Sequence, residues 1–123
     1  MKYSNFNKKH SIGAFISTAV AVVGYIHILH FNESVYSRHV ILNEFYDELQ
    51  DLIDTFAEAW SADNGPVPFE LPKTSASTPE EIIQGLYEMS VSIHPDLDIA
   101  LQNPLEDIMT HCKQTLYKLR KLK

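Results

Sequence analysis

The stretch VYSRHVILNEFYDELQDLIDTFAEAWSADNGPVPFELPKTSAS, residues 35–77, contains a long amphipathic helix and a connection that cannot be helical. In residues 35–61, apolar side chains recur at steps of three and four, which predicts one long α-helix with a single buried stripe. Residues 62–77 contain three prolines, so they cannot form a helix interior. The expected stripe comprises Leu42, Phe45, Tyr46, Leu49, Ile53, Phe56 and Trp60.

The connection is long enough to return along the whole of the helix before it. An extended chain advances about 3.3 Å per residue, whereas a helix rises about 1.5 Å per residue. The helix that follows residues 62–77 can therefore run parallel to the helix that precedes them.

Three more helices are expected, over about residues 11–31, 79–94 and either 96–122 or 104–122. Thr78 and Glu81 form a capping box around a proline at the first helical position, and Ser34 is expected to cap the second helix. One long crossover between helices 2 and 3 is typical of ferritin-like bundles. We therefore expect residues 1–123 to form a single all-α domain, a ferritin-like four-helix bundle.

Composition narrows the class of protein. Cys112 is the single cysteine, so no intrachain disulfide can form and a cytoplasmic location is expected. The formal net charge of -6 gives no strong nucleic-acid signal. Residues 11–29 are apolar and nearly long enough to span a bilayer, but they include Ser17, Thr18 and His27. A buried bundle helix is expected here in preference to a membrane anchor.

Four polar residues near the second helix are candidate metal ligands: His30, His39, Asp54 and Glu58. On a helical wheel with Leu42 at 0° and about 100° per residue, His39, Asp54 and Glu58 lie at about 60°, 120° and 160°. These three residues therefore share one flank of the helix, outside the apolar stripe. The two carboxylates are one turn apart and can close on one cation, while the two histidines lie close to the same tight turn.

One chain cannot bring both pairs to a single ion. His39 and Asp54 are about 22 Å apart along a straight helix, and metal–ligand bonds are about 2 Å long. If two copies of the helix cross antiparallel about a two-fold axis, the histidines of one chain meet the carboxylates of the other. The spacing therefore predicts a homodimer with two equivalent shared sites.

The run HFNESVYSRHVILNEFYDELQDLIDTFAEAW, residues 30–60, resembles the first half of the Dps-type mini-ferritins. The shared features are a His-aromatic-Asn turn, a second histidine, and Asp-x-x-x-Glu further along the helix. It also resembles small uncharacterised ferritin-like proteins of large tailed phages, through Ser34, His39 and the YDEL segment at 46–49.

The resemblance implies an iron site at the dimer interface. The ligands it implies are His30, His39, Asp54 and Glu58. His27, twelve residues before His39 as in the mini-ferritins, is an alternative, and Asn43 stands where those proteins often have an additional acid. His111 and Asp107 form another pair one turn apart, but Glu-x-x-His is absent from the sequence, so an intrachain di-iron site is not predicted.

Two functions follow as hypotheses, beside a third in which the protein is attached to a membrane through the helix at about residues 11–31. The first is a ferroxidase that oxidises Fe(II) with peroxide or oxygen, with no catalytic residues beyond the metal ligands, as a dimer or as a larger oligomer or cage. The second is a non-catalytic phage accessory or virion protein that uses the dimeric bundle as an interaction module. A phage-encoded protein would be located in the host cytoplasm.

Overall fold

The chain is all-helical in its regular structure, as predicted. A computed structural model describes residues 3–122, and the side chains of residues 8–122. It consists of α1 (Tyr3–Asn32), α2 (Tyr36–Asn64), α3 (Pro79–Ile93), a single 3₁₀ turn, η1 (His94–Asp96), and α4 (Ile99–Lys121). Across the part of the chain that the structure describes, there is no β-strand.

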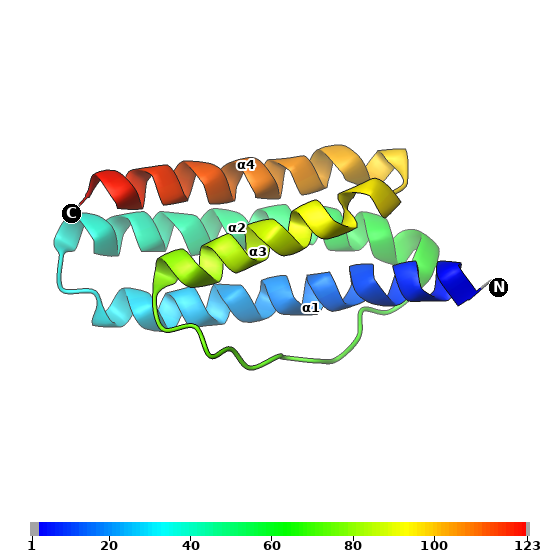
Figure 1. Cartoon of the computed structure of the whole chain (residues 1–123), viewed down its shortest axis with the longest axis horizontal. Coiled ribbons are helices and arrows are strands. Elements are labelled where there is room, and N and C mark those ends of the chain that lie inside the picture. The colour runs from blue at the N-terminus through cyan, green and yellow to red at the C-terminus, as the bar shows by residue number, and fades with distance from the viewer. Residues whose placement is uncertain (1–2, 123) are drawn as a thin grey trace.

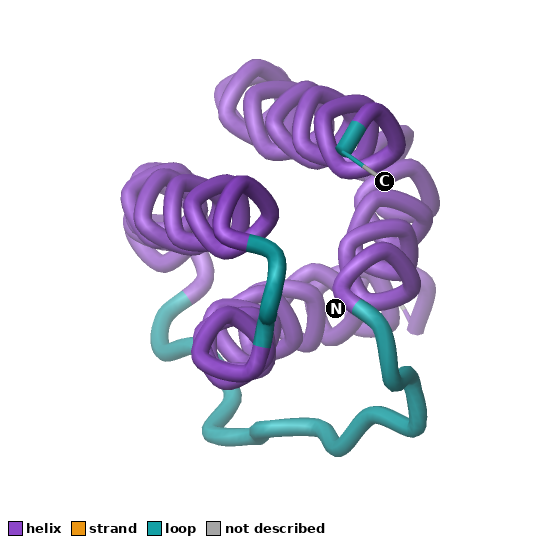
Figure 2. Tube along the Cα trace, turned by 90° about the vertical axis from the view of Figure 1, so that its left-hand side faces the viewer, coloured by secondary structure: helices purple, strands orange, loops and turns teal. Residues whose placement is uncertain are grey.

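The four α-helices surround one core (Figure 1). α1 and α4 each pack against α2 and α3, so the bundle has α1 opposite α4 and α2 opposite α3. Each helix is antiparallel to both of its neighbours, whereas the opposite helices α2 and α3 run in the same direction. The end-on view in Figure 2 shows the connection between α2 and α3 passing along the outside of α1.

The predicted stripe of α2 forms the centre of the core. All seven of its residues, from Leu42 to Trp60, are buried. They pack against buried side chains of the other three helices, among them Phe15 of α1, Leu86 of α3 and Ile108 of α4. The Phe15 and Phe56 rings meet edge to face with centroids 5.6 Å apart.

The long connection is attached to α1 by specific contacts. The hydroxyl of Ser17 donates to the carbonyl of Pro68 at 2.6 Å, and the hydroxyl of Tyr25 donates to the carbonyl of Pro72. Pro68 also lies so close to Gly13 that a Cβ added there would be 2.9 Å from the proline Cδ. A glycine at position 13 therefore allows the connection to approach α1.

Several helix ends differ from the sequence expectations. α1 begins at Tyr3, well before residue 11, and α4 begins at Ile99 with Pro104 inside its second turn. Because proline has no backbone N–H, Pro104 cannot donate the helical hydrogen bond to the carbonyl of Ala100. Thr78 caps α3 through the backbone N–H of Glu81, as predicted.

The expected cap of α2 by Ser34 is wrong. Val35 is the N-cap residue and makes no side-chain cap. Instead, the Glu33 carboxylate accepts from the backbone N–H of Val35 at 3.3 Å and from Arg38 Nε at 2.7 Å. The start of α2 is therefore fixed by an ion pair across the turn.

By length and composition, the Lys8–Asn32 part of α1 is apolar enough to cross a membrane. Half of its most apolar window is buried inside the bundle. Its buried residues include Phe15, Ile16 and Ile26, which contribute to the core shared with α2. Packing in the bundle thus accounts for much of the apolar character of this segment.

Candidate functional site

Three histidines meet where α1 ends and α2 begins. The rings of His30 and His39 stack with centroids 3.8 Å apart, and the His27 ring lies 5.9 Å from that of His30. The His27 ring also stacks on Tyr46 of α2 at 4.3 Å and on Phe31 at 4.8 Å. The tight turn between the helices therefore gathers two predicted ligands and the alternative ligand into one cluster.

His39 has a defined orientation. Its Nδ1 lies 2.8 Å from the backbone carbonyl oxygen of His30. Because a carbonyl can only accept, Nδ1 carries the hydrogen and donates it. In the neutral ring, Nε2 then has a free lone pair with which it can bind a cation.

His30 is buried, with 7 % of its surface exposed. Its Nδ1 is the one fully buried side-chain N or O atom without a hydrogen-bond partner among the described residues. Burial lowers the pKa of His30, and the adjacent His39 lowers it further; the nearby backbone of His27 and the carboxylate of Asp47 act in the opposite direction. The ring is therefore favoured in its neutral form, which is the form that binds metals.

The predicted carboxylates lie further along α2. Asp54 and Glu58 are both exposed, one turn apart. Asp54 lines a shallow cleft of about 150 Å³ between α1 and α2, together with Val20, Val23 and Gln50. Across the residues that the structure describes, no three His, Cys, Asp or Glu side chains are placed to hold a metal ion. The structure therefore brings the histidines together but not the histidines and the carboxylates.

Sequence reasoning missed two neighbours of the histidines. The hydroxyl of Tyr46 donates to Oδ1 of Asn43 at 2.6 Å, and burial raises the pKa of Tyr46. The Asn43 amide in turn donates to Asp47 at 3.4 Å. Asp47 follows His39 by eight residues, or about two turns, and this spacing on the same flank was the signal that could have identified it.

Asn43, the additional candidate ligand, already uses its side-chain oxygen to accept from Tyr46. His111 is also engaged elsewhere. Its Nε2 donates to the backbone carbonyl of Phe45 at 2.9 Å, and its Nδ1 is 3.3 Å from Glu48. His111 thus connects α4 to α2, and its carboxylate neighbour is Glu48 where the sequence suggested Asp107.

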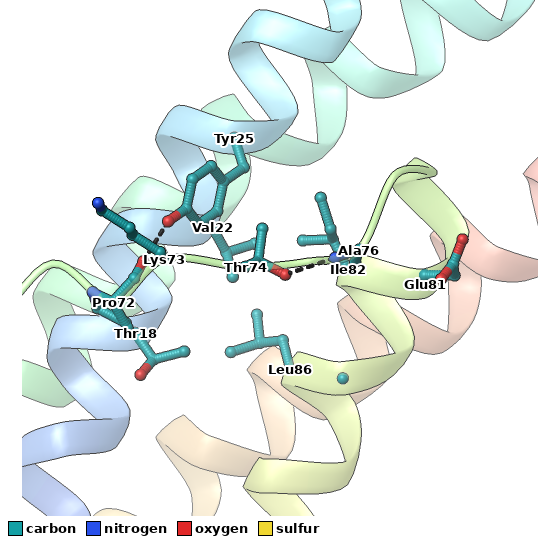
Figure 3. A pocket seen from close by; sticks show the side chains of 11 residues that line it. Thr18, Val22, Tyr25, Pro72, Lys73, Thr74, Ala76, Glu81, Ile82 and Leu86 are labelled. Carbon is teal, nitrogen blue, oxygen red and sulfur yellow. Dashed lines mark hydrogen bonds between the residues drawn. The ribbon is translucent and has the colours of Figure 1, made fainter.

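A separate cleft of about 190 Å³ lies between α1, the connection and α3 (Figure 3). Its wall is mostly apolar, with Val22, Ile82 and Leu86 among the lining residues. The charged ends of Lys73 and Glu81 point outward at its rim. This cleft contains no histidine and is distinct from the histidine cluster.

Comparisons with known proteins place the chain in a family. Residues 30–119 match the family described as "Family of unknown function (DUF5856)", and the match includes all four predicted ligands. The chain is 29% identical to the "Uncharacterized 14.6 kDa protein in mobD-ri intergenic region" of Enterobacteria phage T4, over 97% of this chain and 98% of that one. These findings support a small phage protein and give no indication of a mini-ferritin. No solved structure matches. The chain belongs to the DUF5856 family of unknown function.

Proposed function

We propose that the protein is a ferritin-like homodimer that binds Fe(II) between its two chains and oxidises it. The observation that carries the proposal is the pairing of His30 and His39 at the α1–α2 turn, with Nδ1 of His30 buried and unpartnered. A buried polar atom without a partner is costly. A bound cation is one partner that would remove this cost.

The connectivity of the bundle supports the ferritin-like part of the proposal. Ferritin-like bundles have one long crossover, whereas simple up-and-down bundles have short loops only. Here the chain crosses from the end of α2 to the start of α3 outside α1, and α2 and α3 run in the same direction.

The donor atoms suit iron. Imidazole nitrogens and carboxylate oxygens are the ligands of many non-haem iron sites. The neutral His30 ring and the free Nε2 of His39 would contribute two nitrogens. Asp54 and Glu58 of the partner subunit would contribute the oxygens, since these carboxylates are exposed on the α2 flank. The site therefore needs two chains.

The residues would act by charge and by position. The carboxylates stabilise Fe(III) more than Fe(II), because the product carries the higher charge. The hydrogen bond from His39 to the carbonyl of His30 holds one ligand in place before iron binds. Two Fe(II) ions lose one electron each; hydrogen peroxide takes up both electrons with two protons and becomes two water molecules. With oxygen as the oxidant, the same two electrons and two protons give hydrogen peroxide.

An interaction module without catalysis is the second candidate. The observation in its favour is that the histidine rings pack on Tyr46 and Phe31 as ordinary aromatic side chains do. Stacking of this kind stabilises a helix–helix turn without any ligand. In that case the histidines tie α1 to α2, and the outer face of the bundle carries the function.

Anaerobic Fe(II) titration distinguishes the two candidates. We expect the wild type to bind iron and to oxidise it when peroxide or oxygen is added. His39→Ala and Glu58→Ala should each lose both sites, because each homodimer lacks one half of every shared site. His94→Ala is the matched control: His94 directly follows α3, whose end lies at the opposite end of the bundle from the α1–α2 turn, and it pairs with Glu106 at 2.8 Å.

Mixing the two variants tests whether each site is shared between two chains. A heterodimer of His39→Ala and Glu58→Ala chains has one site with both defects and one site with wild-type ligands only. We therefore expect about half of the wild-type iron binding per heterodimer, which is expected only of a site shared between chains. If the wild type binds no iron above background, or both variants bind it normally, the ferroxidase proposal is wrong and the interaction module takes its place.

A further inference from the structure

One side of α1 carries a stripe of apolar side chains that remain exposed among the described residues, next to the place where the connection contacts the helix. Val20, Ile28 and Phe31 are all exposed, Phe31 to 67 %. Gly24 lies in the middle of the stripe, and a Cβ added to it would meet no atom within 4 Å. The stripe therefore has large side chains at its ends and an open position at its centre, where another helix can approach closely.

An apolar cleft of about 340 Å³ lies at one end of this stripe. It is formed where the connection passes α1, and Phe69 at its edge is 100 % exposed. Its floor is fixed, because the hydroxyl of Ser17 donates to the carbonyl of Pro68. The residues that line it are Ser17, Val20, Val67, Pro68, Phe69, Glu70 and Leu71.

The projecting ring and the cleft are placed symmetrically about the glycine. Phe31 follows Gly24 by seven residues, and Ser17 precedes it by seven, so each lies about 10 Å from it along the helix. If two copies of α1 pack antiparallel about a two-fold axis at Gly24, a residue that precedes Gly24 in one chain faces the residue that follows Gly24 by the same number of positions in the other chain. Phe31 of one chain then lies opposite Ser17 of the other.

We infer that a second copy of this chain packs antiparallel on α1 about a two-fold axis at Gly24. In this arrangement, the Phe31 ring of each copy enters the cleft beside Ser17 and Val20 of the other. Val20 of one copy meets Ile28 of the partner subunit, and the two glycines face each other at the axis. The contact is self-complementary, as a two-fold interface requires.

The same axis agrees with the separation of the candidate ligands on α2. Val20 and Val23 line one cleft with Gln50 and Asp54, so Gly24 is level with about Leu49 in the neighbouring helix. His39 precedes Leu49 by ten residues and Glu58 follows it by nine. An axis at this level therefore brings Glu58 of the partner subunit opposite His39. This agreement rests on the proposed function, whereas the fit of Phe31 to the cleft does not.

Cross-linking of the metal-free full-length protein tests the axis. Gly24→Cys should form an intermolecular disulfide on mild oxidation, because residues at a two-fold axis are close to their own copies. Gly85→Cys is the matched control, since Gly85 is another exposed helical glycine with open space at its Cβ. We expect at least about tenfold more cross-linked dimer from position 24 than from position 85. Equal cross-linking of both, or none at position 24, would overturn the proposal.

Sedimentation equilibrium tests the contact of the ring with the cleft. Phe31→Asp should weaken the dimer at least about tenfold, since aromatic side chains that fill a pocket of the partner contribute strongly to such interfaces. Tyr117→Asp is the matched control, because Tyr117 is 60 % exposed on α4 and should leave the dimer unchanged. Circular dichroism checks that both variants remain helical. A monomeric wild type at 50 µM, a concentration chosen for the test, or equal effects of both substitutions would refute the interface.

These measurements need no iron, so they separate the interface from the proposed function. A metal-free dimer that cross-links at position 24 supports the interface even if iron never binds. If the protein binds iron but stays monomeric, the α1 interface is refuted. Whether the protein binds metal at all is decided by the iron titration alone.

Discussion

The rings of His30 and His39 stack at 3.8 Å, and the same two residues share a hydrogen bond from the His39 ring to the His30 carbonyl. His30 lies in the last turn of α1 and His39 in the first turns of α2. The pair thus closes the tight turn on one side, while Arg38 and Glu33 close it on the other at 2.7 Å. A pair that is already held in this way can act as a structural tie, as half of a metal site, or as both.

Replacing His39 should destabilise the fold even without metal. His39→Ala removes one hydrogen bond and the ring contacts with His30 and Tyr36, and we expect the free energy of unfolding to fall by about 1–2 kcal/mol. Urea denaturation in the presence of a chelator measures this. His94→Ala, which removes a more exposed pair with Glu106, should cost less than about 1 kcal/mol. Equal losses in the two variants would argue against a structural role for the stacked pair.

The free energy of unfolding should decrease as the pH is lowered through the range where His30 titrates. The pKa of His30 in the folded protein is lowered from its ordinary 6.5, mainly by burial. As the pH drops through 6.5, His30 is protonated in the unfolded chain but stays neutral in the folded chain. The folded state therefore loses stability until the pH falls below the lower pKa that His30 has in the folded protein. Well above pH 6.5, His30 is neutral in both the folded and the unfolded protein, so this loss of stability does not occur.

Urea midpoints of the metal-free protein between pH 7.5 and pH 5, a range chosen for the test, measure this dependence. The groups that face His30 are His27, His39 and Asp47. His30→Gln should reduce the loss of stability at low pH while keeping these neighbours. An unchanged pH dependence in this variant would show that another group is responsible. Iron affinity should decrease over the same range, because protonated imidazole cannot bind a metal.

Gly13 should be required for the approach of the connection to α1. In Gly13→Ala the new methyl group would lie 2.9 Å from Cδ of Pro68 and 3.3 Å from the Trp60 ring. We expect a loss of about 1–3 kcal/mol, because both neighbours are rigid. Gly85→Ala is the control: its Cβ meets nothing within 4 Å, and alanine in a helix should add about 0.5–1 kcal/mol. Thermal unfolding that shifts both variants in the same direction would contradict this account.

Arg38 should be the most important ionic residue for stability. Its guanidinium bonds to Glu33 and Glu80 and to the carbonyl of Leu119, and so joins the α1–α2 turn to the start of α3 and the end of α4. Arg38→Leu leaves the Glu33 carboxylate without this partner, and we expect a loss of about 2–4 kcal/mol. Arg120→Leu removes a hydrogen bond that stays within α4, from Arg120 Nε to the carbonyl of Leu116 at 3.3 Å, and should cost much less. Denaturant midpoints that rank the two variants the other way would refute this ranking.

The sequence predicted the helices best where the spacing of apolar side chains or a capping box defines them. The seven residues of the α2 stripe are all buried, and Thr78 caps α3 as its capping box indicated. These features depend on neighbours within one or two turns, which the sequence itself specifies. The early start of α1 at Tyr3 was missed because its first residues lack a strong cap or an apolar stripe.

The candidate site was only partly predictable, because its contacts form between helices. The placement of His30 and His39 near one turn followed from their positions in the chain. Their stacking, the ring of Tyr46 beside His27, and the approach of Asp47 depend on how α1 rotates against α2. Periodicity assigns a residue to a face but does not fix which side chains of two neighbouring helices meet.

Cys112 should be unreactive in the folded protein, which makes the native chain a suitable background for cysteine cross-linking. The thiol is buried in α4, and burial raises its pKa to about 12. Because the thiolate is the reactive form, alkylation by iodoacetamide at neutral pH should need transient unfolding. We expect the wild type to react at least about 100-fold more slowly than Gly85→Cys under the same conditions, as followed by mass spectrometry, because Gly85 is exposed and lies outside the proposed interface. In urea above the unfolding midpoint, Cys112 should react as fast as an ordinary thiol. Rapid labelling of the native wild type would show that α4 opens readily, and a Cys112→Ala background would then be needed for cross-linking at position 24.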